Sequence, residues 1–236
     1  MTDRTPPLPP ALPRRIRSFV RREGRLTAAQ ARALETLLPR YGLAFGPQVL
    51  DFEAVFGRRA PRLLEIGFGD GAALVAHAQS HPDWDHLGIE VHRPGIGRLL
   101  RELEARGLGN VRVICHDASE VLETQIPDAS LDKVLLYFPD PWPKKRHHKR
   151  RLVQPPFAAL VARKLVPGGV WQLATDWEDY AQQMLEVLGA CPTLRNAAPD
   201  SGFAPRPAER PPTRFERRGE KLGHGVWDLL FVKEKD

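Results

Sequence analysis

The sequence predicts an α/β fold in which helices cover both faces of a doubly wound, mainly parallel sheet. From residue 62 to about residue 188, short apolar runs typical of strands alternate with segments of helical periodicity. A glycine-rich turn, Gly67 to Gly71, joins the first such run to the first helical segment after it. The last run, Val226 to Val232, has no helix before it, so we expect it to enter the sheet antiparallel to the others.

The chain begins with a basic stretch that is not expected to fold alone. Residues 1–25 are rich in arginine and proline, and they are interpreted as a flexible arm that serves either RNA binding or solubility. Thr27, with Gln30 three residues later, forms a capping-box pattern that begins a helix, and Pro39 is expected to end it. Residues 26–236 are expected to form a single domain.

The alternating elements follow in order. Apolar runs predict strands at 62–68, 86–91, 111–116, 131–138 and 170–175. Helical periodicity predicts helices at 72–81, 94–106, 157–165 and 177–188, the third of which Pro167, Gly168 and Gly169 are expected to end. Residues 192–212 are proline-rich and polar, which is typical of a mobile loop.

Composition and charge exclude several classes of protein. The net charge of +6 favours an anionic partner, with nucleic acid first and an anionic membrane surface second. No apolar run approaches the roughly 18 residues of a membrane span, and the N-terminus lacks the apolar core of a signal peptide. Cys115 and Cys191 give no disulfide framework, which fits a cytoplasmic protein, and Cys115 is expected to be a small core residue.

The glycine turn and three acids predict a nucleotide-like cofactor. Glycine lets the backbone approach a ligand closely, although this spacing also fits the looser dinucleotide pattern. Acids at three successive strand ends favour S-adenosylmethionine instead. Glu65 would meet its ammonium group, Glu90 its ribose hydroxyls, and Asp117, beside Ala118, its adenine amino group. The alternatives are a buried, hydrogen-bonded acid for Glu65 and solvated strand ends for the other two.

The stretch from Tyr137 to Arg151, YFPDPWPKKRHHKRR, predicts a second part of the site. Pro139 and Pro141 stiffen the backbone around Asp140 at the end of a buried strand, where open α/β sheets place their ligands. Trp142 offers a flat face on which a base could stack. Six cations then follow without an acid among them: Lys144, Lys145, Arg146, Lys149, Arg150 and Arg151. A simple turn and a solvated charged face are the alternatives.

Six motifs together resemble the bacterial tRNA (guanine-N7-)-methyltransferases. They are LLEIGFGDG, GIEVH, the Asp117-Ala118 pair, YFPDPWPKKRHHKRR, ATDW at 174–177 and TRFERRGEKLGHGVWDL at 213–229. The resemblance covers residues 45 to 233. It implies a Rossmann-like class I S-adenosylmethionine-dependent methyltransferase domain that methylates N7 of guanine 46 in the variable loop of tRNA.

The resemblance also implies roles for individual residues. The cofactor-binding residues would be Glu65, Gly67, Gly69, Glu90, Asp117 and Asp140, of which Asp140 would also be the catalytic acid. The substrate- and RNA-binding residues would be Lys144, Arg146, His147, His148, Lys149, Arg150, Arg151, Asp176, Thr213, Arg214, Phe215 and Glu216.

The expected chemistry depends on positioning. Guanine N7 carries a lone pair and no proton, so no base is needed to generate the nucleophile. A fixed carboxylate could stabilise the cationic guanine or accept its N1–H and N2–H protons, and Asp140 and Asp176 are the candidates. The alternative for Asp176 is an N-cap of the following helix. Phe215 could stack on the base and Glu216 could accept guanine protons, or they could be a core residue and a surface acid.

Three other functions stay open at the level of the residues themselves. The chain could be a methyltransferase that acts on another RNA, a protein or a small molecule, a non-catalytic RNA-binding module, or a dinucleotide oxidoreductase. Cofactor turnover that depends on tRNA would separate the tRNA methyltransferase from all three. The adjacent His147 and His148 face different ways on any regular element, so no metal site is expected, and no protein partner is expected to be required.

Overall fold

The computed structural model describes residues 18–19, 25–211, 216 and 225–235. Within them, apolar runs form strands whose central members are buried on both faces, as a parallel sheet covered by helices requires. The strands are β1 (Gly42–Leu43), β2 (Arg62–Ile66), β3 (Asp85–Ile89), β4 (Val111–Ile114), β5 (Leu131–Tyr137), β6 (Leu165–Thr175), β7 (Leu194–Asn196) and β8 (Trp227–Lys233).

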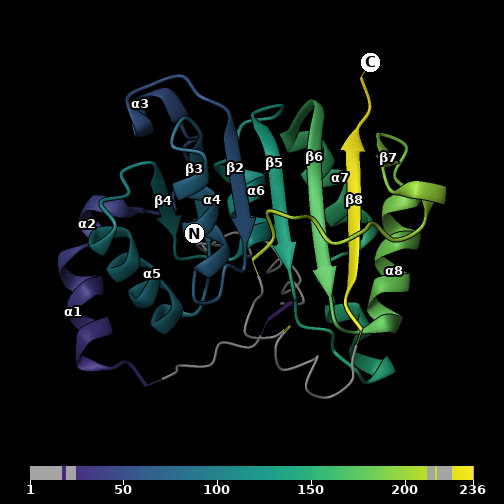
Figure 1. Ribbon diagram of the computed structural model, residues 1–236, viewed down its shortest axis with the longest axis horizontal. Coiled ribbons are helices and arrows are strands. Elements are labelled where there is room, and N and C mark those ends of the chain that lie inside the picture. The colour runs from purple at the N-terminus through teal and green to yellow at the C-terminus, as the bar shows by residue number, and fades with distance from the viewer. Residues whose placement is uncertain (1–17, 20–24, 212–215, 217–224, 236) are drawn as a thin grey trace, which may run out of the picture.

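One sheet contains all of these strands, in the order β1-β4-β3-β2-β5-β6-β8-β7 (Figure 1). The pairs β1–β4, β4–β3, β3–β2, β2–β5 and β5–β6 are parallel. In contrast, β8 runs antiparallel to both β6 and β7. The predicted fold class is therefore confirmed, including the antiparallel last strand.

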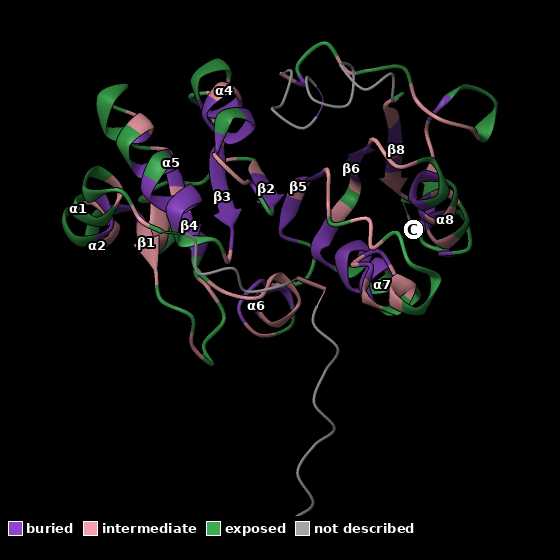
Figure 2. Cartoon of the chain, turned by 90° about the horizontal axis from the view of Figure 1, so that it is seen from below, coloured by how far each residue is buried: buried purple, intermediate pink, exposed green. Residues whose placement is uncertain are grey.

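Helices cover both faces of the sheet (Figure 2). They are α1 (Ala28–Thr36), α2 (Leu38–Tyr41), α3 (Phe52–Phe56), α4 (Ala72–Ser80), α5 (Arg93–Ala105), α6 (Ala118–Thr124), α7 (Pro155–Lys164) and α8 (Glu178–Gly189), with 3-10 turns at Lys145–Arg150 and Pro199–Ser201. Side chains of α1, α4 and α5 form one apolar cluster with the sheet, and those of α6, α7 and α8 form a second. In the described part of the chain, none of the helices is long and apolar enough to cross a membrane.

The first helix begins as predicted but ends differently. The Gln30 N–H donates to the Thr27 hydroxyl (3.2 Å), and the Thr27 N–H donates to Gln30 Oε1 (2.9 Å), which completes the capping box. Pro39 does not end this helix, because α1 already stops at Thr36 and Pro39 lies in the first turn of α2. A proline is tolerated there because the first N–H groups of a helix have no intrahelical partner.

The predicted helix 157–165 ends where expected, since α7 stops at Lys164. The strand predicted to begin at residue 170 begins earlier, because β6 starts at Leu165 and Pro167–Gly169 lie inside it. The pairing of β5 with β6 moves from Leu131–Leu165 to Lys133–Val170, so the residues between form an irregular bulge. A bulge accommodates proline and glycine, which a regular ladder does not.

The stretch predicted as a mobile loop, 192–212, is built into the edge of the sheet. It contains β7, and beyond it the Ala204 N–H donates to the Asp228 carbonyl of β8 (2.8 Å). The chain then crosses in front of β8 and β6 toward β5 (Figure 1), and the Arg210 side chain is fully buried. Polar contacts hold this segment, and a hydropathy pattern does not reveal such contacts.

Three smaller features also differ from the expectations. Cys115 is exposed rather than part of the core, because β4 ends at Ile114 and the cysteine follows it. Two short helices, α3 and α6, have no counterpart among the predicted elements.

The first turn of α5 packs directly on the glycine turn that follows β2. A Cβ atom at Gly95 would lie 2.0 Å from the Gly69 carbonyl oxygen, so only glycine fits at this position. The close approach lets α5 determine where the backbone of the glycine turn lies.

We predict that Gly95→Ala lowers the free energy of unfolding by about 1–3 kcal/mol, because the added methyl group must displace the Gly69 backbone. Helix propensity alone would favour alanine by roughly 1 kcal/mol, so the sign of the change separates the two effects. Urea unfolding measures it, with Gly109→Ala as the matched control, since a Cβ atom there would meet no atom within 4 Å. An unchanged or raised stability of Gly95→Ala would contradict the close packing.

Candidate active site

Five neighbouring parallel strands end at the same edge of the sheet, which we call the rim. The register pairs Ile66 of β2 with both Ile89 of β3 and Leu136 of β5, and Tyr137 of β5 with Ala174 of β6. Acids lie at or just after these strand ends: Glu65, Glu90, Asp117, Asp140 and Asp176. Open α/β sheets bind their ligands at this edge.

The glycine turn after β2 uses backbone angles that favour glycine. Gly67, Gly69 and Gly71 have φ values of 69°, 57° and 81°. A Cβ atom at Gly67 or Gly69 would meet no atom within 4 Å, whereas one at Gly71 would lie 2.7 Å from Leu99 Cδ1. The first two glycines therefore leave open space at the rim, and the third lets α4 pack against α5.

Glu90 holds the glycine turn in place. Its Oε2 accepts a hydrogen bond from the Gly69 N–H (2.9 Å), and its Oε1 accepts from the N–H groups of Val91 (2.7 Å) and His92 (2.9 Å). These three backbone donors satisfy the carboxyl group, which is almost fully buried. Contact with ribose hydroxyls, the role expected of Glu90, stays a prediction.

Glu65 is buried beside two other acids without a full set of partners. Only 3% of the residue is exposed, and its Oε2 has no hydrogen-bond partner. Burial, followed by the negative charges of Glu90 and Asp70, raises the pKa of Glu65 to about 8. An unpartnered buried carboxyl oxygen is costly unless a ligand satisfies it, so this position suits a cationic group.

Two cavities meet at the glycine turn. One, of about 360 Å³, is lined by residues that include Ile89, Glu90, Ala118 and Asp140. The other, of about 570 Å³, contains Glu65. The two cavities share these lining residues: Gly67, Gly69, His92, Tyr137 and Phe138. The mainly apolar space suits the adenine of S-adenosylmethionine, and the unpartnered Glu65 oxygen next to it suits the ammonium group.

Asp117 has a second role that its position on the chain did not reveal. It is the N-cap of α6, and its Oδ1 accepts hydrogen bonds from the N–H groups of Ser119 (2.8 Å) and Glu120 (3.4 Å). Its neighbours His116 and Ala118 line the smaller cavity, whereas Asp117 itself does not.

Sequence reasoning missed an aromatic pair at this end of the rim. The rings of Phe45 and His116 are stacked, with centroids 3.7 Å apart and an interplanar angle of 9°. Phe45 follows β1 and His116 follows β4, so the parallel pairing of these strands brings the two rings together. The only signal was the strand-end position of His116, because β1 is too short to produce a pattern.

The segment around Asp140 has unusual backbone angles. Phe138 and Trp142 adopt φ values of 51° and 46°, which are rare for bulky side chains and often mark functional sites. Asp140 is exposed and lines the smaller cavity, and its catalytic role stays a prediction. The Trp142 indole N–H donates to the Ser18 carbonyl (2.9 Å), and the Arg150 guanidinium lies 3.8 Å from the ring centroid. One face of Trp142 is therefore covered by Arg150 rather than open to a base.

The basic stretch forms a 3-10 turn whose cations are mainly exposed. The exposed side chains are Lys144, Lys145, Arg146 and Lys149. Desolvation and the neighbouring charges of Arg146 and Arg150 hold the pKa of His147 below its ordinary value. Among the described residues, no three His, Cys, Asp or Glu side chains are grouped so that they could hold a metal ion.

Arg151, which was expected to contact RNA, is buried and does not belong to this exposed surface. Its guanidinium is 1% exposed and donates to the Pro141 carbonyl (2.8 Å), to Gln183 Oε1 (2.6 Å) and to Asp179 Oδ2 (2.5 Å). It also lies 4.8 Å from the centroid of the Tyr180 ring. Arg151 therefore ties the Pro141 turn to α8, and its burial leaves no donor at the surface.

The structure decides between the alternatives given for two further acids, Asp176 and Glu216. Asp176 is not the N-cap of α8, because that position is Trp177, and no side-chain bond caps the helix. Glu216 is 2% exposed and pairs with Arg210, which excludes the surface-acid alternative. The predicted substrate residues Thr213, Arg214 and Phe215, and most of the arm at residues 1–25, lie outside the described residues.

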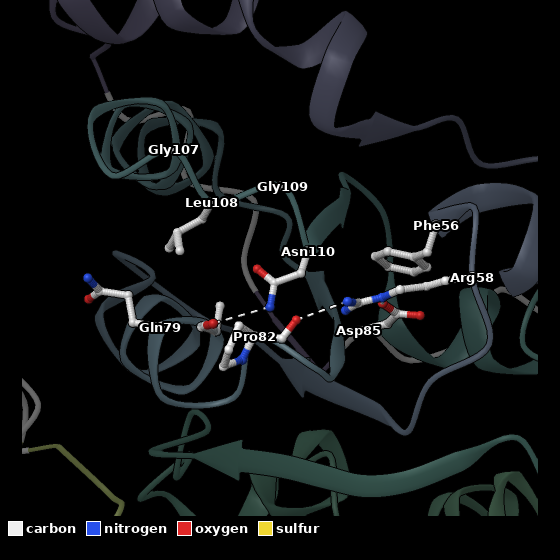
Figure 3. A pocket seen from close by; sticks show the side chains of 10 residues that line it. Phe56, Arg58, Gln79, Pro82, Asp85, Gly107, Leu108, Gly109 and Asn110 are labelled. Atoms are coloured by element: carbon white, nitrogen blue, oxygen red, sulfur yellow. Dashed lines mark hydrogen bonds and ion pairs between the residues drawn. The ribbon is translucent and has the colours of Figure 1, made fainter.

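A cavity of about 530 Å³ lies at the opposite edge of the sheet, near the start of β3 (Figure 3). Several of its polar groups bind one another or the backbone of the surrounding loops. Arg58 Nε donates to Asp85 Oδ1 (2.7 Å) and its Nη1 donates to the Pro82 carbonyl (3.0 Å), while Asn110 Nδ2 donates to the Ala78 carbonyl (3.2 Å). These contacts fix the loops at the starts of the strands, away from the rim.

Comparison with known proteins identifies close relatives. Residues 59–229 match a family model described as putative methyltransferase. The chain is 61% identical over 220 residues to a tRNA (guanine-N(7)-)-methyltransferase of Alcanivorax borkumensis, a match that covers 93% of this chain and 92% of the relative. It is 63% identical over 223 residues to the protein of the same name in Methylococcus capsulatus, which covers 93% and 94%.

Solved structures share the fold at much lower identity. A variant of the 16S rRNA (adenine(1408)-N(1))-methyltransferase of Catenulisporales acidiphilia, determined with its cosubstrate SAM, has a TM-score of 0.55 at 16% identity and covers 79% of this chain and 92% of that one. The 16S rRNA methyltransferase KamB has a TM-score of 0.54 at 15% identity, with 79% and 95% covered. These similarities confirm the predicted Rossmann-like methyltransferase fold.

The raised pKa of Glu65 predicts how stability depends on pH. In the unfolded chain this carboxyl loses its proton near pH 4.5, whereas in the folded chain it keeps the proton to about pH 8. Between these values the folded state binds one proton more, so the free energy of unfolding falls as pH rises, by at most about 1.4 kcal/mol per pH unit from this group.

Glu65→Gln removes this titration while keeping the shape of the side chain. We predict that the stability of the variant relative to the parent protein increases between about pH 5 and about pH 8, as measured by urea unfolding without added ligand. The exposed Glu53→Gln serves as the control for the same chemical change elsewhere. A stability difference that stays constant with pH would contradict the buried, proton-retaining carboxyl.

Proposed function

The chain belongs to the family of tRNA (guanine-N(7)-)-methyltransferases, and on that premise we propose that it transfers a methyl group from S-adenosylmethionine to N7 of guanine 46 in the variable loop of tRNA. One observation carries the proposal: the unpartnered Glu65 carboxyl and the exposed Asp140 open onto cavities that share one wall, next to an exposed basic turn. The proposal includes tRNA as the partner and the cytoplasm as the location.

The glycine turn and its acids would hold the cofactor. When bound, S-adenosylmethionine supplies an electrophilic methyl group on a sulfonium sulfur. Glu65 would bind the ammonium group, and this contact would satisfy its unpartnered oxygen. Glu90, fixed by three backbone N–H groups, would face the ribose, and the open space at Gly67 and Gly69 would admit the ligand against the backbone.

Asp140 and Asp176 would act on the guanine. They follow the adjacent parallel strands β5 and β6, so both lie at the rim. Because N7 already has a lone pair, the protein needs no general base and instead must align the base with the methyl group. The guanine becomes cationic as the methyl group arrives, and a fixed carboxylate nearby lowers the energy of that state. Asp140 also lines the cofactor cavity, which suits a residue that serves both ligands.

The basic stretch would bind the RNA backbone. Lys144, Arg146, His147, His148, Lys149 and Arg150 lie on or beside the 3-10 turn that follows the Asp140 segment. Basic side chains at this position would contact phosphates and orient the variable loop toward the rim. The stretch from Thr213 to Glu216 would contact the guanine itself.

The direct experiment is transfer of labelled methyl from S-adenosylmethionine to unmodified tRNA transcripts, followed by mapping of the modified base. The proposal predicts label on N7 of a variable-loop guanine and none when that guanine is replaced. Cofactor binding without transfer to any tRNA would instead favour a different methyl acceptor, either another RNA, a protein or a small molecule.

We predict that Asp140→Asn lowers kcat for tRNA methylation by roughly 100-fold, because the fixed negative charge near the cationic guanine is lost. Single-turnover rates and S-adenosylmethionine affinity, measured separately, divide the effect between guanine and cofactor. Asp83→Asn, an exposed aspartate on the loop before β3, is the control. If the Asp140→Asn variant folds and methylates tRNA at the parent rate, Asp140 has no role in methyl transfer.

We predict that alanine at Lys144, Lys145, Arg146 and Lys149 together weakens tRNA binding and makes it less sensitive to salt. Each lost phosphate contact should reduce the slope of log K against log salt by roughly 0.7–0.9 over the range of about 50 to about 200 mM. S-adenosylmethionine affinity should be unchanged, because these side chains do not line its cavities.

A matched control changes four exposed arginines on other parts of the surface, Arg59, Arg101, Arg163 and Arg195, to alanine. This control removes the same net charge, so it separates a local contact from general attraction to RNA. Equal salt slopes for the two fourfold variants would show that the basic turn is only a solvated face.

A further inference from the structure

Arg210 is a fully buried cation that joins three parts of the molecule. It lies in the segment that crosses β8 and β6 in front of the sheet (Figure 1). Its side chain is 0% exposed, although arginine is among the residues least often buried. No role in the chemistry described above uses it.

The guanidinium binds two buried carboxylates. Nη1 and Nη2 donate to Glu216 Oε2 (2.9 Å) and Oε1 (3.0 Å), and Nη2 also donates to Asp228 Oδ2 (3.0 Å). Nε lies 2.8 Å from Asp228 Oδ1. Arg206, whose Nη1 is 3.4 Å from Glu216 Oε1, balances the second negative charge. The planar fork of arginine fits such paired contacts, whereas the single ammonium of lysine does not.

The same guanidinium reaches the wall of the cofactor cavities. It lies 5.9 Å from the centroid of the Tyr137 ring and 5.7 Å from that of the Phe138 ring. Both of these aromatic residues line both cavities at the rim. Asp228 pairs in register with Ala174 of β6, two residues before Asp176. Arg210 therefore lies between the cofactor wall and the residue that ends the Thr213–Glu216 stretch.

The crossing segment has other anchors that do not depend on Arg210. The neighbouring Glu209 pairs with Lys133 of β5 and accepts a hydrogen bond from Gln172 of β6 (3.2 Å). The Ala204 N–H donates to the Asp228 carbonyl (2.8 Å). Loss of the Arg210 fork should therefore weaken the contacts that fix Glu216 without detaching the segment from the sheet.

We propose that Arg210 is a positioning residue for methyl transfer. It fixes Glu216, and with it the end of the substrate-binding stretch, at a set distance from the Tyr137–Phe138 wall behind which the cofactor binds. This inference rests on the proposed function, in which the Thr213–Glu216 stretch contacts the guanine. A small displacement of the base relative to the methyl group slows transfer strongly, even when RNA and cofactor still bind.

The test compares Arg210→Lys with Arg195→Lys, the same change at an exposed arginine of β7. We expect Arg210→Lys to lower kcat for tRNA methylation by at least about 30-fold while the KM for tRNA and the Kd for S-adenosylmethionine stay within about threefold. A purely structural role would instead lower the melting temperature and the active fraction, and it would leave kcat per folded molecule unchanged. That result, or a kcat within about threefold of Arg195→Lys, would overturn the inference.

A double-mutant cycle with Glu216→Gln tests the route of the effect. If Arg210 acts through Glu216, the double variant should be no slower than Glu216→Gln alone, whereas additive losses would overturn the proposal. Should Arg210→Lys fail to fold, Asp228→Asn keeps the shape of the cluster and weakens the same fork. It must then show the same loss of kcat with cofactor binding kept, and an unchanged kcat would count against the inference.

The parent protein separates this inference from the function on which it rests. If the parent protein does not methylate tRNA, the proposed function fails. If the parent protein is active and Arg210→Lys matches Arg195→Lys, only the positioning role fails.

Discussion

The main physical constraint on the site is that the Glu65 carboxyl is buried beside two other acids, Glu90 and Asp70. Glu90 is satisfied by three backbone N–H groups and thereby fixes the glycine turn. Glu65 keeps one oxygen without a partner, and burial near Glu90 and Asp70 raises its pKa to about 8. A folded chain tolerates such a group when a cationic ligand offsets its cost, so the site is built around a ligand with a positive charge.

The parallel register then divides the rim into two halves. The ends of β2, β3 and β4 surround the glycine turn and would form the cofactor half in the proposed function. The ends of β5 and β6, with the antiparallel β8 beside them, are followed by Asp140 and Asp176 and would form the acceptor half. Tyr137 and Phe138 line both cavities and separate the halves. Arg210 lies near both rings and binds Glu216, and this is the contact by which we propose that the spacing of the two halves is set.

Much of the fold could be predicted from the sequence, because buried parallel strands produce long apolar runs and helices between them produce clear periodicity. The glycine turn and the acids at strand ends were also visible, since their positions follow from topology alone. The seven-residue helix α6 was missed because its N-cap, Asp117, had been interpreted as a ligand-binding residue or a solvated strand end.

The remaining errors share a cause, which is that side-chain burial and strand pairing both depend on tertiary contacts. In the sequence, Arg151 and Arg210 cannot be distinguished from exposed arginines. Both are buried in the fold, where they pair with Asp179 and Asp228, which lie elsewhere on the chain. Similarly, Pro167–Gly169 has the pattern of a helix end but forms a bulge inside β6. No local pattern distinguishes these cases.

The most direct test of the account replaces guanine 46 of a tRNA transcript with 7-deazaguanine, in which N7 becomes a C–H group. The Watson–Crick edge and the RNA backbone are unchanged, so the account predicts unaltered binding together with complete loss of methyl transfer from S-adenosylmethionine. Continued transfer to this transcript at the rate of the unmodified one would contradict the assignment of the rim to N7 of that guanine.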